Sequence, residues 1–195
     1  MGIQARVLGE PGRDNAAFVR VDSGQALARL LLDCGAGCPD VLGTGEIQAV
    51  DHLLFSHLHM DHVAGFDSFF RRTYDRTTLP NHVWGPPGTA RILHHRFQGY
   101  LWNLHHGREG TWRVHDVGDD GVEIYRFELS EAFAVCHEEE KQPRRRIIQY
   151  DRETDPLELS EASQEVVLKR VRRTAPVAAS IGVLLIGVWL LRTRR

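Results

Sequence analysis

The chain has 195 residues, of which 42% are hydrophobic, with 24 lysines and arginines against 26 aspartates and glutamates. This composition is that of an ordinary globular protein and excludes collagenous and disordered chains. The length allows one domain with a buried core, but not two full catalytic domains.

The net charge of −2 hides an asymmetry along the chain. Residues 1–140 contain 12 basic and 20 acidic side chains and residues 141–195 contain 12 and 6, so the two parts carry −8 and +6. The acidic part gives no general electrostatic reason to bind nucleic acid, whereas the basic part could meet phosphates or an anionic membrane. All 11 histidines lie between His52 and His137, so histidine chemistry must be built there or borrowed from another chain.

The three cysteines, Cys34, Cys38 and Cys136, are an odd and sparse set in a chain that has no apolar segment at its N-terminus. This pattern favours a reducing compartment and argues against a disulfide scaffold. We therefore expect structural cysteines and a cytoplasmic location for the globular part.

The first 70 residues are predicted to form strands at 5–8, 16–21, 29–33 and 51–56, separated by glycine-containing turns. A polar, glycine-rich stretch at 38–49 is expected to hold a short helix. Strand, crossover and strand together indicate an α/β architecture.

Behind residue 62, Val63, Phe66, Phe69 and Phe70 recur at helical spacing and predict a helix. An amphipathic segment at 90–104 and a strand at 122–129 are expected next. Residues 138–174 begin with a charged stretch that shows no periodicity of apolar residues. We expect residues 138–174 to form a linker.

Residues 175–191 contain one hydroxyl, Ser180, and no charge, and basic residues flank them on both sides. A helix of this length spans about 26 Å, just below the roughly 30 Å hydrocarbon core of a bilayer. The basic flanks and Trp189 suit the headgroup region, which favours a C-terminal transmembrane helix. A hydrophobic helix packed on the body is the alternative.

The densest group of chemically active side chains lies directly after the strand at 51–56. It consists of His57, His59, Asp61 and His62. On an extended strand end His57 and His59 project to the same side, and a following turn can bring the other two to a second position. Imidazole and carboxylate are ligands that zinc, iron and manganese accept. The alternative is a solvated or capping group of histidines, but this run at a strand exit has no obvious use in packing.

The His-x-His-x-Asp-His run resembles the signature of the metallo-β-lactamase superfamily, and more closely that of its ribonuclease Z-like branch. Residues 32–37, Leu-Asp-Cys-Gly-Ala-Gly, are similar to the strand and turn that precede the signature in the family. Residues 84–89, Trp-Gly-Pro-Pro-Gly-Thr, are similar to the strand end that follows it. The resemblance covers roughly residues 3–130.

This resemblance implies an α/β fold, the αβ/βα sandwich, with residues 1–137 as its first half. It implies that His57 and His59 bind one metal ion, and that Asp61 and His62 bind a second. Asp61 would also act in catalysis by orienting or deprotonating the attacking water. Two Zn²⁺ ions are expected, with Mn²⁺ or Fe²⁺ as alternatives, because paired divalent ions activate water and neutralise charge on a phosphoryl or acyl oxygen.

Ligand histidines need a partner for their second ring nitrogen. Asp33, Asp51 and Asp67 are the candidates for that role, with turn or capping roles as the alternative.

The chain departs from the family pattern in its second half. Enzymes of the family add a third histidine, a bridging aspartate and a last histidine, whereas no histidine follows His137 here. His115 and His137 are the late candidates for the third histidine, although a surface position is the simpler expectation for His137. A homodimer or another partner could supply the missing ligands; alternatively, the chain is an inactive remnant or a truncated frame of a longer enzyme.

The sequence thus predicts a metal-dependent hydrolase that cleaves a phosphodiester, with RNA, a cyclic nucleotide or a small ester as substrate. Arg71, Arg72 and Arg76 could meet such an anion, although a solvated helix face is the simpler expectation. The competing hypothesis is an inactive protein that keeps the first half of the fold and is anchored in a membrane through residues 175–191.

Overall fold

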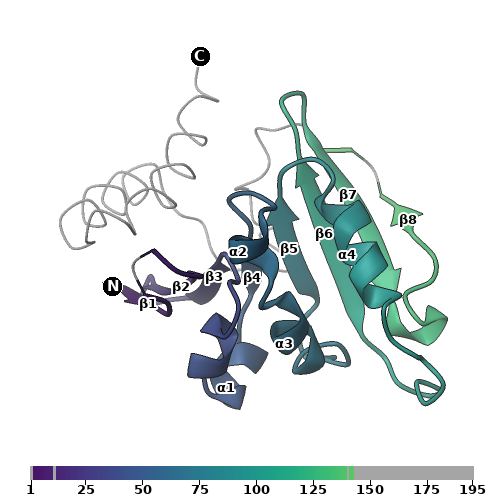
Figure 1. The fold of residues 1–195 in the computed structure, drawn as a ribbon, viewed down its shortest axis with the longest axis horizontal. Helices are drawn as coiled ribbons and strands as arrows, with labels where there is room; N and C mark the ends of the chain where they lie inside the picture. Colours follow the sequence, from purple (N-terminus) through teal and green to yellow (C-terminus); the bar gives the residue numbers. More distant parts are fainter. Residues whose placement is uncertain (1, 11, 140, 143–195) are drawn as a thin grey trace.

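The computed structural model describes residues 2–10, 12–139 and 141–142, which form a mixed α/β fold around one eight-stranded sheet (Figure 1). Along the sheet the strands follow the order of the chain. They are β1 (Gly2–Val7), β2 (Ala17–Asp22), β3 (Leu27–Leu32), β4 (His52–Leu54), β5 (Asn81–Gly85), β6 (Thr111–Val117), β7 (Val122–Glu128) and β8 (His137–Glu138).

Helices occupy the connections between the strands. The α-helices are α1 (Thr44–Gln48), α2 (Met60–Val63), α3 (Phe66–Arg71) and α4 (Thr89–Phe97), and two 3-10 helices span Cys38–Val41 and Leu129–Glu131. Strands β3 to β6 are parallel, and antiparallel pairs flank them on both sides. Because the carboxyl ends of parallel strands lie at one edge of a sheet, the segments that follow β3, β4, β5 and β6 meet at the same edge.

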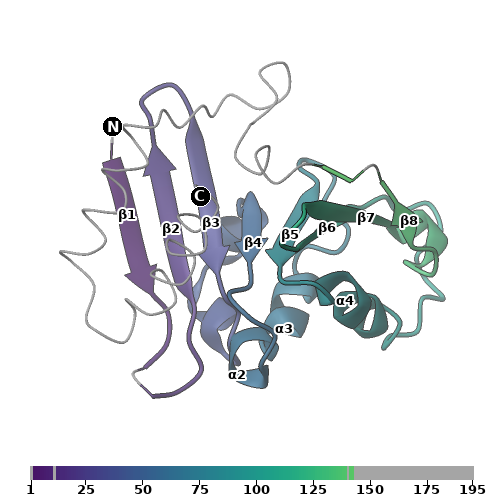
Figure 2. The ribbon, with the colours of Figure 1, turned by 90° about the horizontal axis from the view of Figure 1, so that it is seen from above.

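The main hydrophobic core lies between the sheet and helices α3 and α4, which pack against the same face (Figure 2). Leu31, Leu53 and Val83 point to this face from adjacent strands and are at most 1% exposed. Phe66 from α3 and Phe97 from α4 pack against them within the same cluster. The phenylalanine spacing that predicts a helix behind the histidines therefore marks the buried side of α3.

The opposite face of the sheet carries two smaller clusters. Val21 packs with Ala28, and Val117 packs with Val122 and Ile124. Within the part of the chain that the structure describes, no second sheet covers this face. The described residues thus form one layer of strands with helices packed on one of its faces.

The expected strands at 5–8, 16–21, 29–33 and 51–56 correspond to β1 to β4, and the strand at 122–129 corresponds to β7. The amphipathic segment expected at 90–104 contains most of α4, which ends at Phe97. Beyond the helix, the indole of Trp102 donates a hydrogen bond to the Phe97 carbonyl at 2.7 Å. Glu138, the first residue of the stretch expected to be a linker, belongs to β8, and Gln142 forms a bridge to Val122.

The segment at 175–191, predicted to span a membrane, lies outside the described residues. Among the residues that the structure does describe, no helix has the length and apolar character needed to cross a bilayer.

Candidate metal centre

The predicted ligands lie on the loop that follows β4 and on the short helix α2. His57 is on the loop, His59 occupies the N-cap position of α2, and Asp61 and His62 lie within that helix. Because β4 is parallel to β3 and β5, this loop emerges at the edge of the sheet where the turn after β3 also begins.

That turn starts with Asp33, whose backbone has a left-handed conformation, φ 57°. Aspartate tolerates this region better than most residues other than glycine. The conformation lets the buried carboxylate reach the motif loop, where its Oδ1 accepts hydrogen bonds from the backbone N–H of Ser56 at 2.8 Å and from the Ser56 hydroxyl at 2.9 Å. The end of β3 therefore holds the start of the motif.

Backbone contacts join the same two segments further along. Cys34 N–H donates to the carbonyl of His62 at 2.7 Å, and Gly65 N–H donates to the carbonyl of Cys34 at 2.8 Å. A Cβ atom at Gly35 would lie 2.6 Å from the carbonyl oxygen of Asp61. The glycine after Cys34 is thus required for the turn to approach the motif.

The four predicted ligands converge in space. Ligand atoms of His57, His59 and Asp61 lie within 4.8 Å of one another. The His62 ring is 3.8 Å from the His57 ring, centroid to centroid, and its Nε2 lies 3.3 Å from Oδ2 of Asp61. His59 and Asp61 are exposed, so an ion and a substrate could both reach this group. Imidazole nitrogens and a carboxylate at these separations fit a divalent metal ion.

Two side chains lie behind the predicted ligand histidines. The Ser56 hydroxyl is 3.0 Å from Nδ1 of His57, and Oδ2 of Asp33 is 2.9 Å from Nδ1 of His62. The second pair is within ion-pair distance but does not form a hydrogen bond. Burial and the neighbouring His62 lower the pKa of His57, while Asp33 acts in the opposite direction. A lowered pKa favours the neutral imidazole, which is the form that binds metal.

The sequence offers three aspartates as partners of the ligand histidines, and the structure places Asp33 against the motif. Asp51 instead accepts a hydrogen bond from the backbone N–H of Arg29 at 2.6 Å, and burial raises the pKa of its carboxyl. Asp67 forms an ion pair with Arg96 at 3.0 Å. Sequence reasoning missed Ser56, although its position beside His57 was an available signal.

The late histidines have other contacts. His115 is buried on the sheet face opposite the helices, where it stacks on Trp84 at 3.7 Å and its Nε2 lies 3.0 Å from Nδ1 of His82. His137 lies on β8, with Nε2 2.6 Å from a carboxylate oxygen of Glu131. These contacts place neither candidate for the third histidine among the motif residues.

Two of the three arginines behind the motif make contacts within the fold. Arg76 is 4% exposed and donates hydrogen bonds to the carbonyls of Gln48 and Val50 at 2.9 and 2.6 Å. Arg72 forms an ion pair with Asp40 at 3.1 Å. Both expectations for Arg76 were wrong, since it neither lies on a solvated helix face nor is free to meet an anion.

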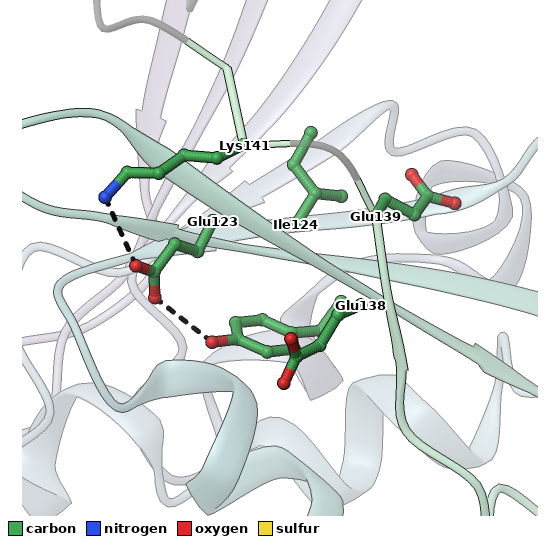
Figure 3. A pocket seen from close by; sticks show the side chains of 6 residues that line it. Glu123, Ile124, Glu138, Glu139 and Lys141 are labelled. Atoms are coloured by element: carbon green, nitrogen blue, oxygen red, sulfur yellow. Dashed lines mark hydrogen bonds and ion pairs between the residues drawn. The ribbon is translucent and has the colours of Figure 1, made fainter.

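A pocket of about 220 Å³ lies on β7 and β8, apart from the motif residues (Figure 3). Within it, Glu123 accepts a hydrogen bond from the Tyr125 hydroxyl at 3.1 Å and forms an ion pair with Lys141 at 3.4 Å. Burial raises the pKa of Tyr125 to about 12. The charged groups of this pocket are thus partly neutralised by each other, and it brings together no set of metal ligands.

Comparisons with known proteins agree with the motif. Residues 15–142 match the family of the anti-Pycsar protein Apyc1. A ribonuclease Z from Deinococcus radiodurans is 58% identical over 142 residues, which is 73% of this chain and 43% of that protein. A ribonuclease Z from Myxococcus xanthus is 41% identical over 108 residues, or 47% of this chain and 34% of that protein. The chain therefore spans less than half the length of these curated relatives.

Among solved structures, the short form of human tRNase Z shares 16% identity with this chain at a TM-score of 0.37. The aligned region covers 63% of this chain and 57% of the human chain.

Proposed function

Because the chain belongs to the family of the anti-Pycsar protein Apyc1 and is a ribonuclease Z-like member of the metallo-β-lactamase superfamily, we propose that it is a metal-dependent phosphodiester hydrolase. The observation that carries the proposal is the convergence of His57, His59, Asp61 and His62 at one edge of the sheet. Histidine nitrogens and carboxylate oxygens are the donor atoms that divalent metal ions accept in proteins.

In this proposal His57 and His59 hold one ion and Asp61 and His62 hold a second, with zinc expected and manganese or iron as alternatives. A bound divalent ion would lower the pKa of a water molecule and neutralise charge on a phosphoryl oxygen. Asp61 is exposed and lies beside His62, so its carboxylate can accept a proton from the attacking water. The turn at Asp33 keeps the loop in place while the substrate binds.

The proposed substrate is a phosphodiester, and RNA is the first choice because the curated relatives are named ribonuclease Z. Residues 1–140 carry a charge of −8, which disfavours unspecific attraction of a polyanion. We therefore expect substrate recognition to depend on the metal centre itself. A cyclic nucleotide or a small ester would bind at the same centre.

The four donors described here leave two for each of two ions, where about three protein ligands are typical of catalytic zinc. A second copy of the chain could supply the others. The homodimer stays a prediction, which analytical ultracentrifugation of the full chain with and without Zn²⁺ would test.

The proposal is tested by hydrolysis of bis(p-nitrophenyl) phosphate with Zn²⁺ or Mn²⁺ by the full chain and by His59→Ala and Asp61→Ala. We expect both variants to lose turnover while circular dichroism stays unchanged, because their side chains are exposed. His95→Ala, an exposed histidine on α4, is the matched control and should keep activity. Equal turnover in all four proteins would overturn the proposal. A short RNA and a cyclic nucleotide then identify the substrate class.

A further inference from the structure

The Ser56 hydroxyl has more neighbours than it has protons. Its Oγ lies 2.9 Å from Oδ1 of Asp33, 2.8 Å from Oδ2 of Asp33, and 3.0 Å from Nδ1 of His57. A serine hydroxyl has one proton to donate and lone pairs with which to accept. The direction of each hydrogen bond is therefore determined by what the two partners are able to do.

The carboxylate side of this group can only accept. Ionised Asp33 has no proton, and its Oδ1 already accepts the backbone N–H of Ser56 at 2.8 Å. The Ser56 proton is thus directed at Asp33, where the bond gains strength from the negative charge. The oxygen of Ser56 is left as an acceptor for His57.

A neutral imidazole carries one proton on either of its two nitrogens. If Oγ of Ser56 accepts, Nδ1 of His57 must carry the proton, and Nε2 keeps its lone pair. We propose that Ser56 is a positioning residue that fixes His57 as the Nδ1–H tautomer and so presents Nε2 as the metal-binding atom.

This inference rests on the proposed function in so far as His57 is a metal ligand. Ligand histidines usually donate their second N–H to a carboxylate, a carbonyl or water, which fixes the tautomer and the ring orientation. Here Ser56 would relay the effect of Asp33 to His57, while the other carboxylate oxygen of Asp33 lies beside His62. One buried carboxylate would then act on both rings, on His57 through the Ser56 hydroxyl and on His62 through its charge.

The tautomer is measured first, by long-range ¹H–¹⁵N NMR of histidine-labelled full chain without metal. The His57 signals are assigned by their loss in His57→Gln. We expect an unprotonated Nε2 and a protonated Nδ1 in the wild-type chain and in Ser56→Thr, which keeps the hydroxyl. In Ser56→Ala we expect a mixture of tautomers.

Zinc affinity is measured second, by competition with a chromophoric chelator. Loss of such a partner typically costs about 10- to 100-fold in affinity. We expect a loss of about 10-fold in Ser56→Ala and recovery in Ser56→Thr. Ser68→Ala is the matched control, because Ser68 bonds to Asp40 on the surface and should bind zinc like the wild type.

The two readouts separate this inference from the proposed function. An Nε2–H tautomer in the wild-type chain overturns the role of Ser56, even if Ser56→Ala does not fold. Unchanged tautomer and zinc affinity in a folded Ser56→Ala also overturn it and leave the proposed hydrolase intact. A wild-type chain that binds no zinc contradicts the proposed function, whereas the Nδ1–H tautomer would still support the hydrogen-bond assignment.

Discussion

The carboxylate of Asp33 accepts hydrogen bonds from the backbone and the side chain of Ser56, at 2.8 and 2.9 Å, across 23 residues of sequence. This relationship joins the carboxyl end of β3 to the start of the loop that carries the histidine motif. The position of the candidate metal centre therefore depends on a turn that contains none of its ligands.

Asp33→Asn tests this dependence, because the amide keeps the shape of the carboxylate and tolerates the left-handed backbone. We expect zinc affinity to fall about 10- to 100-fold, since His57 and His62 lose a charged neighbour. Competition with a chelator measures this effect. Asp67→Asn removes an aspartate that pairs with Arg96 and should leave zinc affinity unchanged. Equal losses in the two variants would contradict a specific role for Asp33.

Gly35→Ala should displace the motif loop. The added Cβ would lie 2.6 Å from the carbonyl oxygen of Asp61 and 2.7 Å from the backbone nitrogen of Asn15, and both are backbone atoms. We expect a loss of about 1–3 kcal/mol in the free energy of unfolding, measured in urea, together with weaker zinc binding.

Gly45→Ala is the matched control for this substitution. Gly45 lies in α1, and a Cβ there meets nothing within 4 Å. Alanine should stabilise this position by about 0.5–1 kcal/mol, because glycine is the poorer helix former. If Gly35→Ala behaves in the same way, the close approach of turn and loop is not required.

Arg76→Ala separates a structural role from a role in substrate binding. The buried guanidinium donates to the carbonyls of Gln48, Val50 and Pro80, which would lose their partner. We expect unfolding to become easier by about 2–4 kcal/mol, while zinc affinity at the motif stays within twofold. Arg71→Ala, on the exposed side of α3, should change the free energy of unfolding by less than about 0.5 kcal/mol. A stable Arg76→Ala chain would contradict this assignment.

Three histidines on the sheet face opposite the helices, one buried and two partly buried, predict a dependence of stability on pH. Burial lowers the pKa of His52 to about 4, of His82 to about 3 and of His115 to about 2, with smaller effects from nearby charged groups. In the unfolded chain the pKa of each of these histidines is about 6.5. Their contribution to the free energy of unfolding is therefore complete above about pH 6.5. It is lost as the pH falls below this value, because the unfolded chain then binds protons that the folded chain does not.

As the pH falls below about 6.5, each such histidine lowers the free energy of unfolding by up to about 1.4 kcal/mol per pH unit. Urea unfolding at several pH values between neutrality and pH 5 measures the slope. His82→Gln should reduce the slope, whereas His95→Gln, which removes an exposed histidine, should not. Identical slopes in both variants would show that the folded protein protonates His82 as readily as the unfolded chain does.

The sequence predicted what depends on short-range spacing. Four ligands within six positions and the phenylalanines of α3 are recognisable without the fold, because one strand end or one helix turn brings them together. Strand β6 was missed, although Trp112 and Val114 alternate with Arg113 and His115, which is the pattern of a strand with one apolar face.

What could not be predicted depends on contacts between distant segments. Arg76 follows the motif like an exposed helical arginine. Its burial is decided by the carbonyls of Val50 and Pro80, which lie in the loops before β4 and β5. The choice of Asp33 over Asp51 and Asp67 depends on the left-handed turn after β3, which only the packing of the motif loop against it explains.

The central claim, that the motif holds divalent metal, is tested most directly by metal stoichiometry. Inductively coupled plasma mass spectrometry would be applied to the full chain, His59→Ala and His95→Ala after loading with Zn²⁺ and mild dialysis. We expect the wild type and His95→Ala to retain zinc and folded His59→Ala to lose it. Folded wild-type protein without zinc, or equal zinc in His59→Ala, would contradict the account.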